Sequence, residues 1–187
     1  MGLAYLNGQS WKKITREERF FCLELYRELS DGGVDSFVKY LYSKGVAIDP
    51  FAKFEVGYEV CFYRDLEYRG LFRGDIEKGY SPKRTFDLCL FSEEEMIIIE
   101  AKVFEGMTND QMDDFEQDRE WVPNAVGIKN YRVHLLALTS SIYKPKADTR
   151  KRFDKMLTWM QISELFPNNK LLVRADEIFS EKPVKRG

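Results

Sequence analysis

The feature that most constrains this chain is an apolar run near its middle, Met96-Ile-Ile-Ile-Glu-Ala-Lys-Val103. Its three consecutive isoleucines do not alternate with polar residues. A strand with this pattern is covered on both faces, so it belongs in the interior of a sheet. The run therefore predicts a central β-strand over 96–103, with helices packed on both sides of the sheet.

Further strands and helices are predicted around this run. Apolar segments predict strands over 85–91 and 131–139, and a short strand over 71–76 that could pair with the first of these. Capping boxes at Thr15–Glu18 and Thr108–Gln111 predict helices that begin there, the first ending at 31–33 and the second before Pro123. A helix over 35–44 and a basic amphipathic helix over 148–165 are also expected, followed by a short apolar segment at 171–174.

Residues 50–68 fit two patterns. Phe54, Val56 and Tyr58 belong to an alternating series typical of a strand, although the aromatic residues in this stretch also fit a helical stripe. Asp49 followed by Pro50 is a common helix start, and Gly70 is available as a stop. We therefore expect a helix over 50–68. The fold class that follows is α/β, a central mixed sheet flanked by helices, with extra helices at both ends.

The length of 187 residues and the composition (44% hydrophobic, 32% charged) suit one packed domain. We divide it into N-terminal helices (1–48), a core (49–143) and a basic C-terminal helix and tail (144–187). The sequence contains no apolar run long enough to span a membrane, and its N-terminus lacks the order of a signal peptide. We therefore expect a cytoplasmic protein that does not act at a membrane.

The cysteine and histidine content restricts the chemistry. Cys22, Cys61 and Cys89 are widely spaced in apolar stretches, so neither a disulfide framework nor a zinc cluster is expected. The one histidine, His134, lies in an apolar strand pattern and is interpreted as a core or sheet-edge residue rather than a catalytic one. Any metal must then be bound by oxygen ligands, which suits Mg²⁺ or Mn²⁺.

Three charged residues near the central strand could bind such a metal. Glu100 and Lys102 are two apart on one strand, so both side chains lie on the same face. Asp87 lies on the preceding strand, and all three can converge at one end of the sheet. Carboxylates that hold a divalent ion, with a lysine beside them, can activate water and stabilise charge in phosphodiester hydrolysis. The alternative is that Asp87 or Glu100 forms only an ion pair with Lys102.

Asp87-x12-Glu100-Ala101-Lys102 resembles the active-site motif of the PD-(D/E)XK, or restriction-endonuclease-like, superfamily. The family's core order is helix, three strands, helix, strand (αβββαβ), which matches residues 50–139 as interpreted above. The resemblance implies that Asp87, Glu100 and the carbonyl of Ala101 bind the metal and that Lys102 positions the attacking water. Phe86 stands where the family has a proline, a departure that removes no chemistry.

The resemblance also suggests further catalytic residues. In the exonuclease-like branch of the superfamily, the helix after the Glu-x-Lys strand carries a Gln followed four positions later by an aromatic residue, as Gln111 and Phe115 do here. Gln111 could equally serve only as part of its capping box. Many members place a Glu on the first core helix, and Glu55 or Glu59 could fill that role, or be plain surface charges. If 50–68 is a strand, this comparison lapses for both.

Charge is distributed unevenly along the chain. Residues 1–143 carry a net charge of −7, whereas residues 144–187 carry +5. The basic segment (Arg150, Lys151, Arg152, Lys155) is either a nucleic-acid contact or a solvated helix face. The function expected is that of a Mg²⁺- or Mn²⁺-dependent nuclease acting on nucleic acid, with DNA as the expected substrate and a homodimer as a possible form. The alternative is a nuclease-fold module without catalysis that binds nucleic acid or a protein partner.

Overall fold

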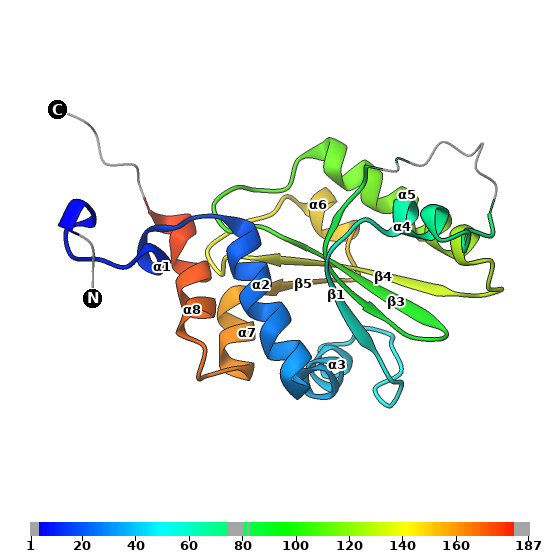
Figure 1. Cartoon of the computed structure of the whole chain (residues 1–187), viewed down its shortest axis with the longest axis horizontal. Coiled ribbons are helices and arrows are strands. Elements are labelled where there is room, and N and C mark those ends of the chain that lie inside the picture. The colour runs from blue at the N-terminus through cyan, green and yellow to red at the C-terminus, as the bar shows by residue number, and fades with distance from the viewer. Residues whose placement is uncertain (1–3, 75–80, 82, 182–187) are drawn as a thin grey trace.

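The computed structural model describes residues 4–74, 81 and 83–181, and a five-stranded mixed sheet lies at its centre (Figure 1). The strands lie side by side in chain order, with β1–β2 and β2–β3 antiparallel and β3–β4 and β4–β5 parallel. Their bounds are β1 Glu55–Val60, β2 Phe86–Phe91, β3 Glu95–Ala101, β4 Arg132–Thr139 and β5 Lys155–Thr158. Every residue of β3 is buried, so the predicted central strand is confirmed.

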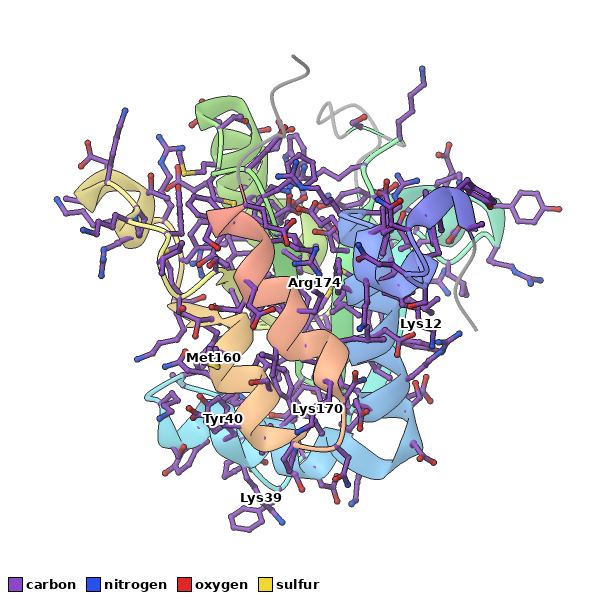
Figure 2. The ribbon with its side chains drawn as sticks, turned by 90° about the vertical axis from the view of Figure 1, so that its left-hand side faces the viewer. Lys12, Lys39, Tyr40, Met160, Lys170 and Arg174 are labelled. Carbon is purple, nitrogen blue, oxygen red and sulfur yellow. The ribbon has the colours of Figure 1, made fainter. Side chains whose placement is uncertain are left out.

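Helices cover both faces of the sheet, which confirms the predicted α/β class (Figure 1). One face carries α2 Glu18–Glu28, α3 Val34–Ser43, α7 Trp159–Leu165 and α8 Lys170–Glu177. The other face carries α4 Phe62–Tyr68 and α5 Asn109–Val126. The short elements are the 3-10 helices Ala4–Leu6 and Ile178–Ser180, α1 Trp11–Ile14 and α6 Ala147–Lys151. Figure 2 shows α8 lying between α2 and α7 on the outer side of the first layer.

Each face of the sheet has its own apolar cluster. On the α2 face, Leu25 of α2 and Trp159 of α7 are fully buried against the isoleucines Ile97 and Ile99 of β3. On the α5 face, Ile98 of β3 belongs to the cluster that includes the aromatic residues of α4 and β2. The side chains of β3 alternate between the two clusters because successive residues of a strand point to opposite faces of the sheet. The strand that the apolar run forms therefore joins the two halves of the core.

A π-helical turn over Leu29–Gly33 connects α2 to α3. Within it Gly32 has φ +92°, a conformation that side chains with a Cβ rarely adopt. The predicted end of the first helix at 31–33 and the predicted second helix are thus confirmed. The chain changes direction between the two helices. This turn sets the angle at which α2 crosses the sheet.

The helix predicted over 50–68 is wrong, because this stretch forms β1, a one-residue break and the short helix α4. Asp49 does not begin a helix. Its Oδ1 accepts a hydrogen bond from the backbone N–H of Phe51, two residues on, at 2.9 Å, which makes a local turn. After that turn the alternating pattern determines the structure, and the segment adds an edge strand to the sheet.

The single helix predicted over 148–165 is also wrong, since the chain there forms α6, β5 and α7 in succession. Asp154 causes the interruption. Its backbone N–H donates to the carbonyl of Leu135 at 2.9 Å, and its Oδ2 accepts from the N–H of Leu135 at 2.8 Å. These two bonds lead the chain into the sheet beside β4. The apolar segment at 171–174 lies within α8.

Three smaller expectations differ from the structure. The first long helix begins at Glu18 rather than at its capping box, because Thr15 Oγ1 accepts from the N–H of Glu17 instead. Helix α5 continues through Pro123 to Val126, and Gly127 with φ +67° follows it. Of the strand expected over 71–76, residues 71–74 are not a strand and 75–76 lie outside the described residues. Among the described helices, none has the length and apolar character needed to cross a membrane.

Candidate active site

Three neighbouring strands carry an acidic residue in the same row across the sheet. Strand β1 pairs with β2 on both sides of Glu59, and the pairing of β2 with β3 ends one residue before Asp87 and Glu100. The same registers continued by one residue bring Glu59 toward Asp87, and Asp87 toward Glu100. Like charges facing one another across strands destabilise a sheet. This row is therefore unfavourable unless cations compensate it.

Lys102 supplies part of that compensation. Its Nζ lies 2.6 Å from Glu100 Oε1 and 3.1 Å from Glu18 Oε1, and its side chain is almost fully buried. Glu18 comes from the first turn of α2, and its Oε2 accepts from the N–H of Val103 at 3.2 Å. The indole Nε1 of Trp159 donates to the carbonyl of Lys102 at 3.0 Å. Lys102 is thus held in place by α2, which precedes it in the chain, and by α7, which follows it.

Asp87 is the second residue of β2, and it lies beside Ala101, the last residue of β3. Its Oδ2 accepts a hydrogen bond from the backbone N–H of Ala101 at 2.8 Å. The N–H and C=O of one residue in a strand point to the same side of that strand. The carbonyl of Ala101 is therefore directed toward β2, on the side where Asp87 lies.

These groups line a cleft with a volume of about 260 Å³. Five carboxylates and three cations contribute to its walls, together with Thr85 and the ring of Phe115. The charged residues are Glu17, Glu18, Arg19, Glu59, Arg84, Asp87, Glu100 and Lys102. Charge is concentrated here in a partly closed space, where an uncompensated ion is costly.

Burial and the neighbouring negative charges raise the pKa values of the acidic groups in the cleft. Burial raises the pKa of Glu100 to about 8, and the charge of Asp87 adds to that shift while Lys102 opposes it. Burial also raises the pKa values of Asp87 and Glu18, against the opposing effects of the Ala101 N–H and Lys102 respectively. Burial alone would lower the pKa of Lys102, but Glu100 and Glu18 outweigh it and raise that pKa. The cleft therefore favours additional positive charge.

The donor set suits Mg²⁺ or Mn²⁺ in its chemistry, since it consists of carboxylate and carbonyl oxygens. Within the described part of the chain, however, no three or more His, Cys, Asp or Glu side chains are already grouped to surround one ion. Two contacts account for this: the ammonium of Lys102 lies against both Glu100 and Glu18, and Asp87 is bonded to the Ala101 N–H. Coordination by Glu100 would require its carboxylate to turn partly away from Lys102.

The other expected site residues are placed differently. Glu59 lines the cleft with φ +51°, and its Oε2 lies 3.3 Å from Arg19 Nε. Glu55 is exposed at the other end of β1 and does not line the cleft. Gln111 belongs to the first turn of α5, but its side chain lies outside the described structure. Phe115, the aromatic residue four positions later, does line the cleft.

Several cleft residues were not expected from the sequence, and Glu18 and Arg84 are the two of them with buried contacts at the site. Glu18 was interpreted as part of a capping box, so its role in contacting Lys102 was hidden. Arg84 lies over the ring of Phe115 at 4.4 Å, and its Nε donates to Asp118 Oδ2 at 2.8 Å. Its Nη2 is buried and has no hydrogen-bond partner among the described residues. No local pattern marks the role of Arg84, because its ion-pair partners Asp114 and Asp118 are 30 or more residues away in the chain.

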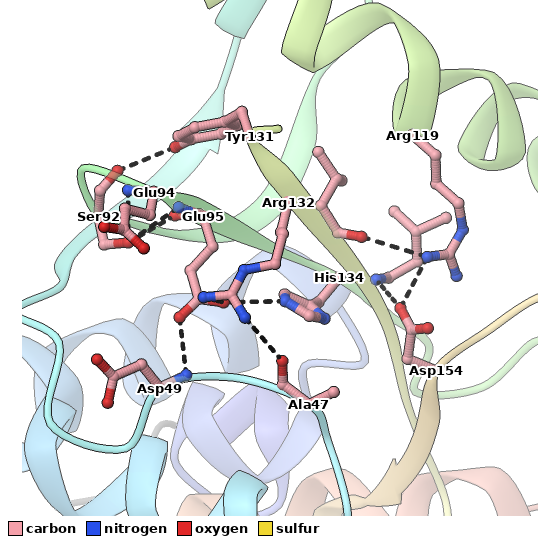
Figure 3. A network of polar contacts seen from close by, with 12 residues as sticks. Ala47, Asp49, Ser92, Glu94, Glu95, Arg119, Tyr131, Arg132, His134 and Asp154 are labelled. Atoms are coloured by element: carbon pink, nitrogen blue, oxygen red, sulfur yellow. Dashed lines mark hydrogen bonds and ion pairs between the residues drawn. The ribbon is translucent and has the colours of Figure 1, made fainter. Parts of the chain in front are cut away.

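A second polar network lies at the opposite end of the sheet (Figure 3). Glu95 begins β3 and is fully buried, with its Oε2 at 3.0 Å from Arg132 Nη2 and 3.1 Å from His134 Nε2. Its Oε1 accepts from the N–H of Asp49 at 2.9 Å. His134 is thus a buried residue of the sheet with an acidic partner, in agreement with the core interpretation. This network ties the turn before β1 to β3 and β4.

The basic residues of the C-terminal segment do not form one helix face. Arg150 and Lys151 are exposed on α6, whereas Arg152 forms ion pairs with Asp113 and Glu116 of α5. Part of the positive charge in this segment is therefore neutralised within the protein. Comparisons with protein-family models, with curated proteins and with solved structures gave no match to this chain.

Proposed function

We propose that this chain is a metal-dependent nuclease that hydrolyses phosphodiester bonds in nucleic acid, with DNA as its expected substrate. The observation that carries the proposal is the convergence of Asp87, Glu100 and Lys102 in one acidic cleft. A buried strand end bearing two acids and a lysine is unfavourable for folding alone. Its excess negative charge is explained if the site works with a divalent ion, Mg²⁺ or Mn²⁺.

The order of the elements supports the proposal. With α3 inserted before β1 and α4 inserted after it, the elements α2, β1, β2, β3, α5 and β4 have the αβββαβ order that the resemblance to the restriction-endonuclease-like superfamily implies. The first helix of that order is α2 rather than the segment 50–68. Glu18 on α2 then takes the role proposed above for Glu55 or Glu59, an acid on the first core helix directed at the metal.

In the proposed mechanism Asp87, Glu100 and the Ala101 carbonyl would hold the ion, and Glu18 and Glu59 line the same cleft. A bound divalent ion would neutralise charge on the phosphate and make water more acidic. Lys102 is held by Glu100 and Glu18 with its ammonium in the cleft, where it can donate a hydrogen bond to the attacking water. Phe115 and Arg84, whose guanidinium lies over the Phe115 ring, also line the cleft.

The proposal is tested by incubating the purified chain with labelled DNA and RNA in the presence of Mg²⁺, Mn²⁺ or EDTA. Cleavage is expected with the metals and absent with EDTA. Asp87→Asn and Lys102→Met should each reduce the rate by about 100-fold or more, because they remove a metal ligand and the ammonium group from the site. The products are read on denaturing gels.

Asp35→Asn is the matched control, because Asp35 forms only an exposed ion pair with Lys53 on the far side of α3. It should leave the cleavage rate unchanged. An absence of cleavage with either metal, or equal activity in Asp87→Asn and the parent chain, would contradict the proposal.

A second candidate is the same arrangement without catalysis, used to bind nucleic acid or a protein partner. It is favoured by the lack of a preformed ligand group among the described residues and by the ion pairs that occupy Lys102. The two candidates differ in their response to metal. Thermal stabilisation by Mn²⁺ that disappears in Asp87→Asn supports the metal site, whereas no stabilisation supports the binding module.

A further inference from the structure

A basic and aromatic segment leads directly into the acidic cleft. Between Trp11 and Arg16 the chain carries Lys12, Lys13 and Arg16, and all four of these side chains are exposed. The next two residues, Glu17 and Glu18, line the cleft. The exposed cations of this segment are thus followed directly in the sequence by carboxylates that line the cleft.

This segment is held in a defined place on the molecule. Arg174 of α8 donates from Nη2 to the carbonyl of Lys13 at 3.2 Å, and Figure 2 labels Lys12 and Arg174. Beyond it, Thr15 is buried and accepts from the N–H of Glu17. The ammonium groups of Lys12 and Lys13 form no ion pair within the described part of the chain.

Phe104 completes the approach to the cleft. It follows Lys102 by two residues, and 41% of it is exposed, which is unusual for a phenylalanine beside a buried strand end. The guanidinium of Arg16 lies over its ring at 5.1 Å. Val103, between Lys102 and Phe104, is bonded to Glu18. The Arg16–Phe104 pair therefore lies at the mouth of the cleft and offers a planar, cationic surface to solvent.

The charge of the cleft makes such a surface necessary for a polyanionic substrate. Five carboxylates and three cations line the cleft, and this excess of negative charge disfavours phosphate groups unless cations at the entrance attract them. Lys12, Lys13 and Arg16 provide that attraction next to the entrance. Arg150 and Lys151 lie on α6, none of whose residues lines the cleft.

We propose that the segment Trp11–Arg16, together with Phe104, binds an unpaired polynucleotide strand and directs it into the acidic cleft. This inference rests on the nuclease function proposed for the cleft and names its substrate as single-stranded nucleic acid or a single-stranded end. Bases of an unpaired strand expose their faces and stack on aromatic rings and on guanidinium planes. In a duplex those faces are covered by neighbouring base pairs. The two lysines contact the phosphates of the same strand.

Binding is measured with EDTA present, so that no cleavage occurs, by fluorescence anisotropy of labelled single-stranded DNA, single-stranded RNA and duplex DNA. The full chain should bind both single strands more tightly than the duplex. Lys12→Gln/Lys13→Gln should weaken single-strand binding by about tenfold or more and reduce the slope of log affinity against log salt by about 1.4, since each phosphate contact on a single strand contributes about 0.7. Arg150→Gln/Lys151→Gln removes the same charge and should change neither quantity.

Phe104→Ala tests the stacking contribution. It should weaken single-strand binding by about tenfold, leave duplex binding unchanged, and be rescued by Phe104→Tyr, which keeps an aromatic ring. Circular dichroism of each variant establishes that it is folded before binding is compared.

Equal affinities of Lys12→Gln/Lys13→Gln and the parent chain would overturn the inference, as would an equal loss in the α6 control. Binding of phosphatidylserine vesicles that depends on Lys12 and Lys13, with no binding of single strands, would overturn it in favour of a membrane surface. Failure of the nuclease proposal is a separate result. A chain that binds strands through this segment but never cleaves them contradicts only the nuclease activity, and an active nuclease with unchanged binding in the variants contradicts only this inference.

Discussion

Asp118 of α5 is a fully buried carboxylate behind the wall of the cleft. Its Oδ1 accepts from the hydroxyl of Tyr63 at 2.6 Å, and its Oδ2 accepts from Arg84 Nε at 2.8 Å. Burial raises the pKa of Asp118 to about 6, even though Arg84 and Tyr63 both favour its charged form. The desolvation of this one side chain is therefore only partly offset by its hydrogen bonds.

The raised pKa predicts a pH dependence of stability. In the unfolded chain Asp118 titrates near 3.8, and in the folded chain near 6, so the folded state binds the proton more tightly. The contribution of Asp118 to the free energy of unfolding is greatest below pH 3.8 and falls as the pH rises through about 6. The loss is about 3 kcal/mol, because one pKa unit corresponds to about 1.4 kcal/mol.

The measurement compares urea unfolding of the parent chain and Asp118→Asn between pH 4 and pH 7. The variant has no carboxyl group at this position, so its stability relative to the parent should increase by about 2 kcal/mol over this range, most of the full effect. Asp35→Asn, at an exposed position, should show no such change. Parallel curves for the parent and Asp118→Asn would contradict the prediction.

Individual site residues were predictable to different extents. Asp87, Glu100 and Lys102 could be found because strand periodicity and the spacing of the motif place them at one sheet end. Glu18 could not, since Thr15-x-x-Glu18 also fits a capping box, and its contact with Lys102 spans 84 residues of chain. The pairing that determines its role is set by the packing of α2 on the sheet, which no local pattern records.

At the scale of elements, the turn between α2 and α3 predicts an effect of a single methyl group. Gly33 has φ −77° and ψ −12°, which an alanine adopts without strain. A Cβ there would nevertheless lie 2.4 Å from the carbonyl oxygen of Glu28 and 2.8 Å from the ring of Phe166. Gly33→Ala should therefore destabilise the fold by about 1–3 kcal/mol, the usual range for overpacking.

Urea unfolding of Gly33→Ala tests this prediction, with Ser30→Ala as the control in the same turn. Ser30 is exposed, so its substitution should change the free energy of unfolding by no more than about 0.5 kcal/mol. A neutral or stabilising Gly33→Ala would show that Glu28 and Phe166 give way to the added methyl group.

The strands were predicted well where the hydrophobic pattern was unambiguous. They were predicted poorly where contacts between residues distant in sequence determine the position of the strand. Strands β2, β3 and β4 lie within two residues of the ranges 85–91, 96–103 and 131–139. Strand β1 was missed because Asp49-Pro50 resembles a helix start, whereas the Asp49 side chain forms a turn. Strand β5 is only four residues long, and its position depends on the exchange of hydrogen bonds between Asp154 and Leu135.

On the scale of the whole molecule, β3 is shared by two apolar clusters that contact different helices. Neither helical layer has a core of its own without the sheet. We therefore expect the described residues to fold as one unit, and the single domain expected from length stays a prediction. The homodimer expected from the sequence stays a prediction, because the structure describes one chain.

A shared central strand predicts one cooperative unfolding transition in which both layers are lost together. Trp159 packs in the α2-face cluster and Trp121 packs against the α5-face cluster, so each reports on one layer. In a Trp11→Phe background, variants that keep only Trp121 or only Trp159 should each give a fluorescence transition that coincides with the far-UV circular dichroism transition of the same variant. Leu25→Ala on α2 should lower the midpoint seen by both tryptophans equally, by a loss of about 2–5 kcal/mol. Two separated transitions, with Leu25→Ala shifting only the one reported by Trp159, would mean that the layers unfold independently and that β3 does not couple them.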